Sequence, residues 1–270
     1  MNTINEISVN EIDRYLSKKI PFIVRDWYPE ASQISKDTEW EYFNTLVVKL
    51  PKNEQAVCAA ASSKTHDFFT TDFKSAFDLI KSEKDEHKYY LFGNTAPTNI
   101  FLKIPWKKKI FFGNVYAASK SVRTKAHFDI WDIVHVQCTG VKTWWLAAPK
   151  SYPSLYPVMD EEKGILRRCL IDLDNPDLSK YPLFSKAKFK KVTVNPGDLL
   201  YVPPLWWHEV ESDTFSISIN ALLPHKTWFY YFVCLQWYYY AFTSTYIYKS
   251  SNYLPRGFVA DVNKMLSRYL

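Results

Sequence analysis

The stretch from Lys88 to Leu223 carries the pattern that most restricts the fold of this chain. It consists of short segments rich in apolar, aromatic and β-branched residues, with polar or turn-forming residues between them. Many short strands at such spacing are typical of a β-sandwich or a β-barrel. The segments are KYYLFG (88–93), FFGNVYAAS (111–119), DIVHVQC (132–138), KTWWLAAP (142–149), KKVTVNPGDLLYVPP (190–204) and FSISINALL (215–223).

The residues on either side predict helices and one further strand. No linker rich in proline, glycine or serine divides the chain. We therefore expect residues 1–87 to pack on a core of residues 88–225, followed by an aromatic helical tail over residues 226–270. Apolar spacing predicts helices over 4–18, over 37–47 after Asp37 or Thr38, and over 73–80 after Thr71 or Asp72, and a strand over 20–27.

Composition excludes several classes of protein. Apolar residues make up 47% of the chain and aromatic residues 17%, which excludes a disordered chain. The six glycines form neither of the usual nucleotide-binding loops. Four cysteines lie far apart without a C-x-x-C pair, which predicts reduced thiols in an intracellular protein of the cytoplasm or nucleus. The first residues lack the basic and apolar regions of a signal peptide.

The segment 227–248 is nearly uncharged and as long as a membrane-spanning helix. Tyrosine and tryptophan dominate it, and these residues prefer interfaces to the centre of a bilayer. We expect no membrane span. The segment is instead predicted to be a helix buried in the core, or a helix that pairs two subunits in a homodimer.

The sequence TKAHFD, residues 124–129, introduces a candidate metal site. His127 and Asp129 have the same parity, so in an extended chain their side chains point to one side. A third ligand, His208, lies in NPGDLLYVPPLWWHEV (195–210), on the bend that we expect after a strand and two prolines. Two histidines and one carboxylate form a facial triad, which leaves three positions of an octahedral Fe(II) open for a bidentate 2-oxo acid and O2.

A lysine in the next strand suits the same chemistry. Lys142 alternates with Trp144 and Leu146 in KTWWLAAP, so it is expected on an interior face. A buried carboxylate is costly unless a cation meets it, and Lys142 can supply that cation to a 2-oxo dicarboxylate. Thr124 can add a hydroxyl donor. Structural histidines with a structural lysine, or a cupin that holds zinc or manganese, remain as alternatives.

Lysines gather in two places, and the net charge of the chain is +6. Each group can be a solvated surface, but together they are compatible with a polyanionic partner such as RNA. The first group is Lys107, Lys108 and Lys109, with Lys103 nearby, and the second is Lys186, Lys188, Lys190 and Lys191.

The order and spacing of these motifs resemble the Jumonji-C (JmjC) family of Fe(II)- and 2-oxoglutarate-dependent oxygenases. The similarity covers roughly residues 88–225 and implies a double-stranded β-helix, a jelly roll of the cupin type. It implies that His127, Asp129 and His208 bind Fe(II), and that Lys142 binds the distal carboxylate of 2-oxoglutarate. It also suggests a hydroxyl contact from Tyr90 and a lining role for Asn220, whose alternatives are a core aromatic and a strand-end cap.

One position departs from that family pattern. Relatives carry an asparagine that contacts 2-oxoglutarate six residues after the first histidine, and here the residue is Ile133. An aliphatic side chain donates no hydrogen bond. His135 has the same parity and is a candidate replacement, although a core histidine is the alternative.

The segment LIDLDNPDLSKYPLFSKAKFK (170–190) resembles one group within the family, the hydroxylases of tRNA wybutosine synthesis. No metal chemistry requires this segment, so its similarity marks a subfamily. The resemblance implies hydroxylation of a wybutosine-type hypermodified guanosine in tRNA. The alternatives are a JmjC protein hydroxylase or lysine demethylase that acts on a peptide, and a non-catalytic binding protein.

Overall fold

The computed structural model describes residues 3–31, 44–51, 67–82, 87–95, 112–129, 131–160 and 165–223. Several sequence predictions lie outside these residues. They are the first part of the helix expected over 37–47, the lysines at 107–109, and the tail over 226–270.

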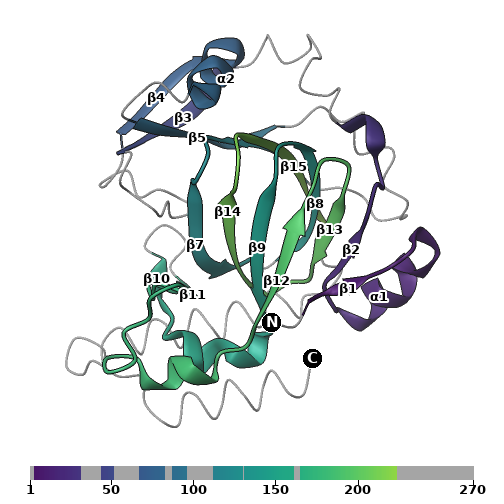
Figure 1. Cartoon of the computed structure of the whole chain (residues 1–270), viewed down its shortest axis with the longest axis vertical. Coiled ribbons are helices and arrows are strands. Elements are labelled where there is room, and N and C mark those ends of the chain that lie inside the picture. Colours follow the sequence, from purple (N-terminus) through teal and green to yellow (C-terminus); the bar gives the residue numbers. More distant parts are fainter. Residues whose placement is uncertain are drawn as a thin grey trace.

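The described strands form two sheets (Figure 1). The larger sheet has nine strands in the order β1-β2-β13-β8-β15-β6-β5-β3-β4, and the smaller has six in the order β10-β11-β7-β14-β9-β12. The larger contains β1 (Asn5–Glu6), β2 (Phe22–Val24), β3 (Asn44–Pro51), β4 (Asp67–Asp72), β5 (His87–Thr95), β6 (Phe112–Ala118), β8 (Asp132–Thr139), β13 (Leu199–Val202) and β15 (Ser216–Leu223). The smaller contains β7 (Arg123–Phe128), β9 (Lys142–Ala147), β10 (Val158–Asp160), β11 (Ile165–Arg168), β12 (Phe189–Val194) and β14 (Trp207–Ser212).

The two sheets pack face to face. Figure 1 shows β7, β14, β9 and β12 side by side in front of β15, β8 and β13. One buried cluster joins them, with Ile133 and Leu200 from the larger sheet and Trp144 and Val192 from the smaller. Apart from β1 with β2, the strand pairs of the described residues are antiparallel. Two stacked antiparallel sheets of this kind form a jelly roll, so the predicted double-stranded β-helix is confirmed.

Helices cover the other face of the larger sheet. Ile12 and Leu16 of α1 (Ile12–Lys18), and Ala76 and Ile80 of α2 (Phe73–Lys81), share a second buried cluster with Val134 of β8. β8 is therefore buried on both faces, which explains the nearly continuous apolar character of its sequence. Short 3-10 helices among the described residues include η1 (Val9–Glu11), η5 (Pro149–Leu155) and η6 (Pro182–Lys186). None of the helices in the described part of the chain is long and apolar enough to cross a membrane.

The N-terminal predictions need one correction. Residues 4–18 do not form one helix, because Asn5 and Glu6 form β1, parallel to β2. The helical part begins at Val9, where Ser8 and Glu11 form a capping box. The backbone N–H of Ile7 donates to the Ile23 carbonyl at 3.0 Å, so pairing with β2 overrides the helical spacing of the apolar residues.

A second correction concerns the helix expected over 37–47. Its last residues, from Asn44, belong to β3, which pairs with β4 and β5. Long-range strand pairing has overridden local spacing here, as it commonly does. The helix predicted over 73–80 is confirmed as α2, and Asp72 caps it by accepting a hydrogen bond from Ser75 N at 2.9 Å.

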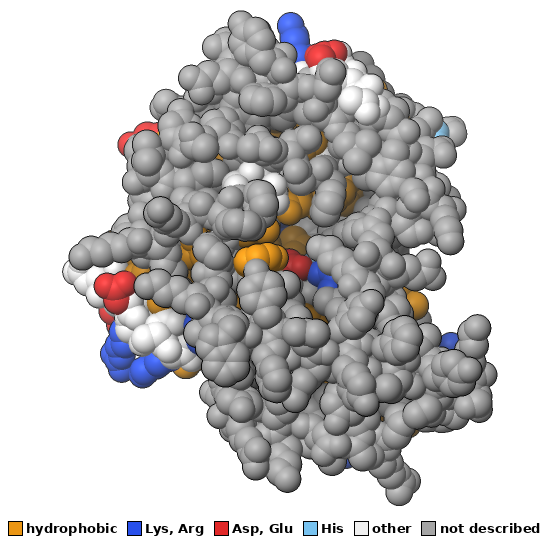
Figure 2. All heavy atoms as spheres, turned by 180° about the vertical axis from the view of Figure 1, so that it is seen from behind, with side chains coloured by type: hydrophobic (Ala, Val, Ile, Leu, Met, Phe, Trp, Pro, Cys, Tyr) orange, Lys and Arg blue, Asp and Glu red, His pale blue; other side chains and the backbone are white. Residues whose placement is uncertain are grey.

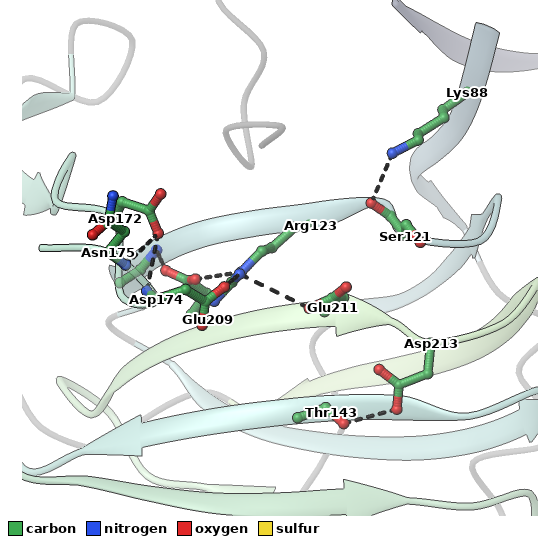
Figure 3. A network of polar contacts seen from close by, with 11 residues as sticks. Lys88, Ser121, Arg123, Thr143, Asp172, Asp174, Asn175, Glu209, Glu211 and Asp213 are labelled. Atoms are coloured by element: carbon green, nitrogen blue, oxygen red, sulfur yellow. Dashed lines mark hydrogen bonds and ion pairs between the residues drawn. The ribbon is translucent and has the colours of Figure 1, made fainter. Parts of the chain in front are cut away.

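His208 lies on a strand and not on the predicted bend. It is the second residue of β14, which pairs with β7 on one side and β9 on the other. The sequence HEVES hides this strand because acidic residues alternate with the inward-facing ones. Those acidic residues, Glu209 and Glu211, lie on the outer face of the smaller sheet next to Arg123 of β7 (Figure 3).

Arg123 is the centre of a largely buried ion-pair network on that outer face (Figure 3). Its Nε lies 2.5 Å from Glu209 Oε1, its Nη1 contacts Asp174, and its guanidinium stacks 4.7 Å over the ring of Trp145. Arg123 is 8% exposed and Glu209 only 3%. Burial raises the pKa of the Glu209 carboxyl to about 7, although the charge of Arg123 acts to lower it. The network ties the loop around Asp174 to the smaller sheet.

Candidate metal centre and cavity

A cavity of about 290 Å3 lies inside the jelly roll, and strands of both sheets line it. Figure 2 shows a hollow near the middle of one face, in which an acidic and a basic side chain lie beside an apolar one. Asp129, Arg167 and Trp131 are among the lining residues. Every candidate residue for Fe(II) or 2-oxoglutarate that the sequence suggested also lines it: Tyr90, Thr124, His127, Asp129, Lys142, His208 and Asn220.

The pairing of β7 with β14 brings the three candidate metal ligands together. His127 lies directly opposite His208, and Asp129 follows the end of β7. One ligand atom from each of these three residues lies within 4.8 Å of the others. The two imidazole centroids are 4.3 Å apart, and His208 Nε2 is 3.9 Å from Asp129 Oδ2.

A bulge in β7 aims these side chains. Between the pairs His208–His127 and Val210–Thr124, β14 advances two residues and β7 advances three. The extra residue lets both Thr124 and His127 face the cavity, although their parities differ. Glu209 Oε2 accepts a hydrogen bond from the backbone N–H of Ala126 in this bulge at 2.9 Å. The ion-pair network on the outer face therefore stabilises the bulge.

Both histidines offer the same nitrogen to the cavity. Nδ1 of His127 donates to the Lys125 carbonyl at 2.8 Å, and Nδ1 of His208 donates to the Trp206 carbonyl at 3.1 Å. A carbonyl only accepts, so in each neutral ring the proton is on Nδ1 and the Nε2 lone pair is free. Burial lowers the pKa of both rings, that of His127 to about 3. Neutral imidazoles with free Nε2 atoms beside a carboxylate fit a divalent transition metal ion.

Arg167 orients the candidate carboxylate ligand, and the sequence did not single it out. Its Nη1 donates to Asp129 Oδ1 at 2.6 Å and to the Phe128 carbonyl at 2.9 Å. Because Oδ1 is held in this way, Oδ2 is the oxygen that faces His208. The only sequence signal was an arginine in a short strand, ILRR, and strand parity alone did not connect it with Asp129.

Lys142 is a buried cation whose charge no described carboxylate matches. It is 5% exposed, and its Nζ donates to Ser218 Oγ at 2.8 Å. Burial lowers the pKa of the ammonium to about 7. An anionic ligand would stabilise the charged form. Ser218 was also missed, although the polar residues of FSISIN recur at every second position and so mark one face of β15.

Tyr90 and Thr124 form a hydrogen-bonded pair in the cavity wall. Both are buried, and burial raises the pKa of the Tyr90 phenol well above its usual range. The phenol therefore stays neutral and can donate a hydrogen bond. Tyr116 of β6 lines the same wall, and its ring centroid lies 6.4 Å from that of Tyr90.

Ile133, His135 and Asn220 line the cavity beside Lys142. His135 is not free to replace the missing asparagine in the way its parity suggested. Its Nδ1 lies 2.7 Å from Asn220 Oδ1, and its Nε2 lies 2.9 Å from Gln137 Oε1. Burial, with the nearby Lys142 charge, lowers the pKa of His135 to about 3.

The second lysine group lies at the end of η6 and along β12. Lys186, Lys188 and Lys191 are exposed and Lys190 is half-buried. Lys191 Nζ lies 5.3 Å from the ring centroid of Trp145. None of the four lines the cavity, and Lys190 and Lys191, as consecutive strand residues, point to opposite faces of β12.

The jelly roll and its His-Asp-His cluster define a cupin-type protein with a candidate metal site. A family model described as Cupin-like domain matches residues 9–231, and the chain belongs to this family. It is 32% identical to the human tRNA wybutosine-synthesizing protein 5, over 64% of this chain and 54% of the relative. The chicken (Gallus gallus) protein of that name is 34% identical, over 62% and 52%. The resemblance noted from the sequence is confirmed.

Another relative carries a different description. HSPB1-associated protein 1 of Rattus norvegicus is 34% identical over 50% of this chain and 30% of the relative. The chain thus spans about half the length of the wybutosine-synthesizing relatives, and less of this one.

Proposed function

We propose that the chain is an Fe(II)- and 2-oxoglutarate-dependent hydroxylase. The observation that carries this proposal is one cavity that holds both a His-Asp-His cluster and a buried lysine without a carboxylate partner among the described residues. A structural role would leave the Lys142 charge unmatched in the interior, which is costly. A metal ion with an anionic chelating ligand supplies the missing partner for both groups.

His127, Asp129 and His208 would hold Fe(II). When bound, Fe(II) with 2-oxoglutarate and O2 supplies the oxidising chemistry that hydroxylates a substrate C–H bond. Lys142, which is hydrogen-bonded to Ser218, would bind the distal carboxylate of 2-oxoglutarate. Tyr90 and Thr124 are hydrogen-bonded to each other, so this pair would donate its one remaining hydroxyl hydrogen to the same ligand. Arg167 keeps Asp129 oriented.

We further propose a wybutosine-type hypermodified guanosine of tRNA as the substrate. The similarity to tRNA wybutosine-synthesizing protein 5 supports this choice. Lysines among Lys186, Lys188, Lys190 and Lys191 would contact phosphates, with Lys107, Lys108 and Lys109 as a second contact. A tRNA substrate also fits an intracellular protein. Because each phosphate contact releases counterions, binding should weaken steeply with salt.

A second candidate function is hydroxylation of a protein side chain. The similarity to HSPB1-associated protein 1, whose name refers to a protein partner, favours this candidate. The cavity chemistry would be the same and only the substrate would differ. A peptide substrate would bind with little dependence on salt.

The test is succinate release by the purified protein with Fe(II), 2-oxoglutarate and oxygen, with and without total tRNA. We expect tRNA to stimulate succinate release, and His127→Ala to abolish it. Turnover that depends on His127 but not on tRNA would leave the oxygenase and reject the RNA substrate. No turnover with tRNA or with a protein extract would contradict the proposal as a whole.

The proposed organisation has two further parts. Residues 88–225 would form the catalytic core with residues 1–87 packed against it, and residues 226–270 would form a homodimer contact. Light scattering on the full chain and on a chain ending at residue 225 tests the dimer, since only the full chain should have twice the monomer mass.

A further inference from the structure

Three polar side chains form a hydrogen-bonded chain beside the cavity. Gln137 and His135 are on β8, and Asn220 is opposite His135 on β15. His135 lies between the two amides, 2.9 Å from Gln137 Oε1 and 2.7 Å from the Asn220 amide. His135 and Asn220 line the cavity, whereas Gln137 lies outside the described lining.

Backbone carbonyls fix the orientation of the Gln137 amide. Its Nε2 donates to the Thr139 carbonyl at 2.8 Å and to the Gly140 carbonyl at 3.1 Å. The reversed amide would place Oε1 against these two oxygens, and none of the three atoms could donate. Oε1 therefore faces His135, and it can only accept a hydrogen bond.

The proton of His135 then has one position. Full burial and the Lys142 charge hold the ring neutral, so it carries a single N–H. That N–H is Nε2–H, because Gln137 Oε1 needs a donor. Nδ1 is then a lone pair, and Asn220 Oδ1, which lies 2.7 Å from it, cannot donate to it. The amide must therefore be turned by half a turn, so that its NH2 group faces Nδ1 instead. A half turn of an amide exchanges its oxygen and nitrogen with almost no change in shape.

We propose that His135 is a positioning residue which, with Gln137, turns the amide of Asn220 so that its carbonyl oxygen faces the cavity. No other hydrogen bond of the Asn220 side chain to a described residue opposes this orientation. We call the chain of hydrogen bonds from Gln137 through His135 to Asn220 the relay. Through it, Gln137, which lies outside the cavity lining, determines whether the cavity wall at Asn220 presents a hydrogen-bond acceptor or a donor.

This orientation sets which ligand groups the wall accepts. Asn220 offers an acceptor and the neighbouring Ile133 offers no hydrogen bond, so this wall favours a water or a hydroxyl group and disfavours a carboxylate. The consequence for 2-oxoglutarate rests on the proposed function. Its carboxylates would find their donors elsewhere, at Lys142, Ser218 and the hydrogen-bonded pair of Tyr90 and Thr124.

The orientation itself is tested by NMR of the metal-free protein with 15N-labelled side chains. We expect a neutral His135 with its proton on Nε2, and a scalar coupling across the hydrogen bond from Asn220 Nδ2 to His135 Nδ1. Loss of the signals in His135→Phe assigns them. A proton on Nδ1, a doubly protonated ring, or an N–H···O contact with no coupling would overturn the relay.

The effect on ligands is tested with Gln137→Leu, by calorimetric titration of 2-oxoglutarate. Without the Gln137 acceptor, the proton can move to Nδ1 and the Asn220 NH2 can turn toward the cavity. We expect 2-oxoglutarate to bind about threefold to tenfold more tightly, the equivalent of one net hydrogen bond. General damage to the fold would weaken binding instead.

The matched control is Cys138→Ala, a fully buried neighbour on the opposite face of β8. It should leave both the His135 tautomer and the affinity unchanged. If Gln137→Leu bound 2-oxoglutarate as tightly as the wild-type protein or more weakly, the inference that Gln137 influences ligand binding through Asn220 would be wrong. If the wild-type protein bound no 2-oxoglutarate, the proposed function would fall, and the NMR coupling would still decide the orientation of Asn220.

Discussion

His208 and Glu209 are consecutive residues of β14 on opposite faces of the smaller sheet. Each is 3% exposed. The carboxylate of Glu209 meets Arg123 and the Ala126 N–H, so its charge and its lone pairs are used within the protein. Nε2 of His208 is left for the cavity, as is the charge of Lys142. Buried polar groups therefore indicate a ligand site when the protein leaves them unmatched, and a structural role when it matches them.

The inner and outer faces of the smaller sheet are also connected through the bulge in β7. The bulge that lets His127 face the cavity is held by Glu209 from the outer face. A variant that changes the charge of Glu209 and one that removes its contact with the bulge should therefore have different effects.

The largest expected effect is on the inner face. His127→Ala removes a candidate metal ligand, so metal affinity should fall by more than about 100-fold, since even outer-shell changes cost 10–100-fold. The free energy of unfolding should change by less than about 1 kcal/mol, because the ring borders an existing cavity. Metal titration and urea unfolding measure the two effects. Retained metal affinity would show that the cluster is not the site.

The next effect concerns the outer face. Glu209→Gln removes the charge that pairs with buried Arg123 but keeps an acceptor for Ala126 N, so it should lower the free energy of unfolding by about 3 kcal/mol and leave metal affinity unchanged. Glu209→Ala should lower both, with metal affinity falling about tenfold. If both variants weakened metal binding equally, the bulge contact would not be what links the two faces.

Lys142 gives the inner face a pH dependence. Its ammonium form would bind a carboxylate of 2-oxoglutarate, and its pKa in the free protein is about 7. Affinity for 2-oxoglutarate should be full below that pH and fall about tenfold per unit above it. Lys142→Arg keeps its charge at these pH values, so the same titration should be flat for this control. A flat profile for the wild-type protein would contradict the assignment of Lys142 to the carboxylate.

The same lysine affects folding with the opposite sign. Its pKa falls from 10.5 to about 7 on folding, so between these values the unfolded chain binds a proton that the folded chain does not. The free energy of unfolding should therefore rise with pH across that window. Lys142→Met should lack this rise, which urea unfolding at several pH values measures.

The last prediction is an increase in the affinity for 2-oxoglutarate. Ile133→Asn restores a donor to the wall beside Asn220, and 2-oxoglutarate should bind about tenfold more tightly, as expected for one hydrogen bond to a charged group. Ile133→Val is the matched control and should change the affinity by less than about twofold. Equal affinities for all three proteins would mean that no carboxylate reaches this wall.

Sequence patterns predicted the strands that are short runs of apolar, aromatic and β-branched residues bounded by polar or turn-forming ones. β8, β9 and β15 were predicted in this way, and α2 with its cap at Asp72 was predicted from apolar spacing. β14 was missed because Glu209 and Glu211 gave it the composition of a loop. The pairing of Asn5 with Phe22, and of β3 with β4 and β5, depends on distant residues that local spacing does not contain.

Residue type and order in the sequence were enough to predict the candidate metal ligands, but not the residues that orient the side chains of the site. Arg167 and Gln137 act through hydrogen bonds to other side chains, and no motif marks them. Thr124 and His127 differ in parity, so regular alternation would place them on opposite faces, and the bulge in β7 is what brings both to the cavity. Bulges and hydrogen-bond relays arise from the packing of strands that are distant in sequence.

The most direct test of the central claim is anaerobic equilibrium dialysis of the protein against Fe(II) and 2-oxoglutarate. We expect one iron and one 2-oxoglutarate per chain, with 2-oxoglutarate bound tightly only when iron is present. Lys142→Met should keep the iron and lose the 2-oxoglutarate. Binding of neither ligand by the wild-type protein, or 2-oxoglutarate binding that Lys142→Met leaves intact, would contradict the account.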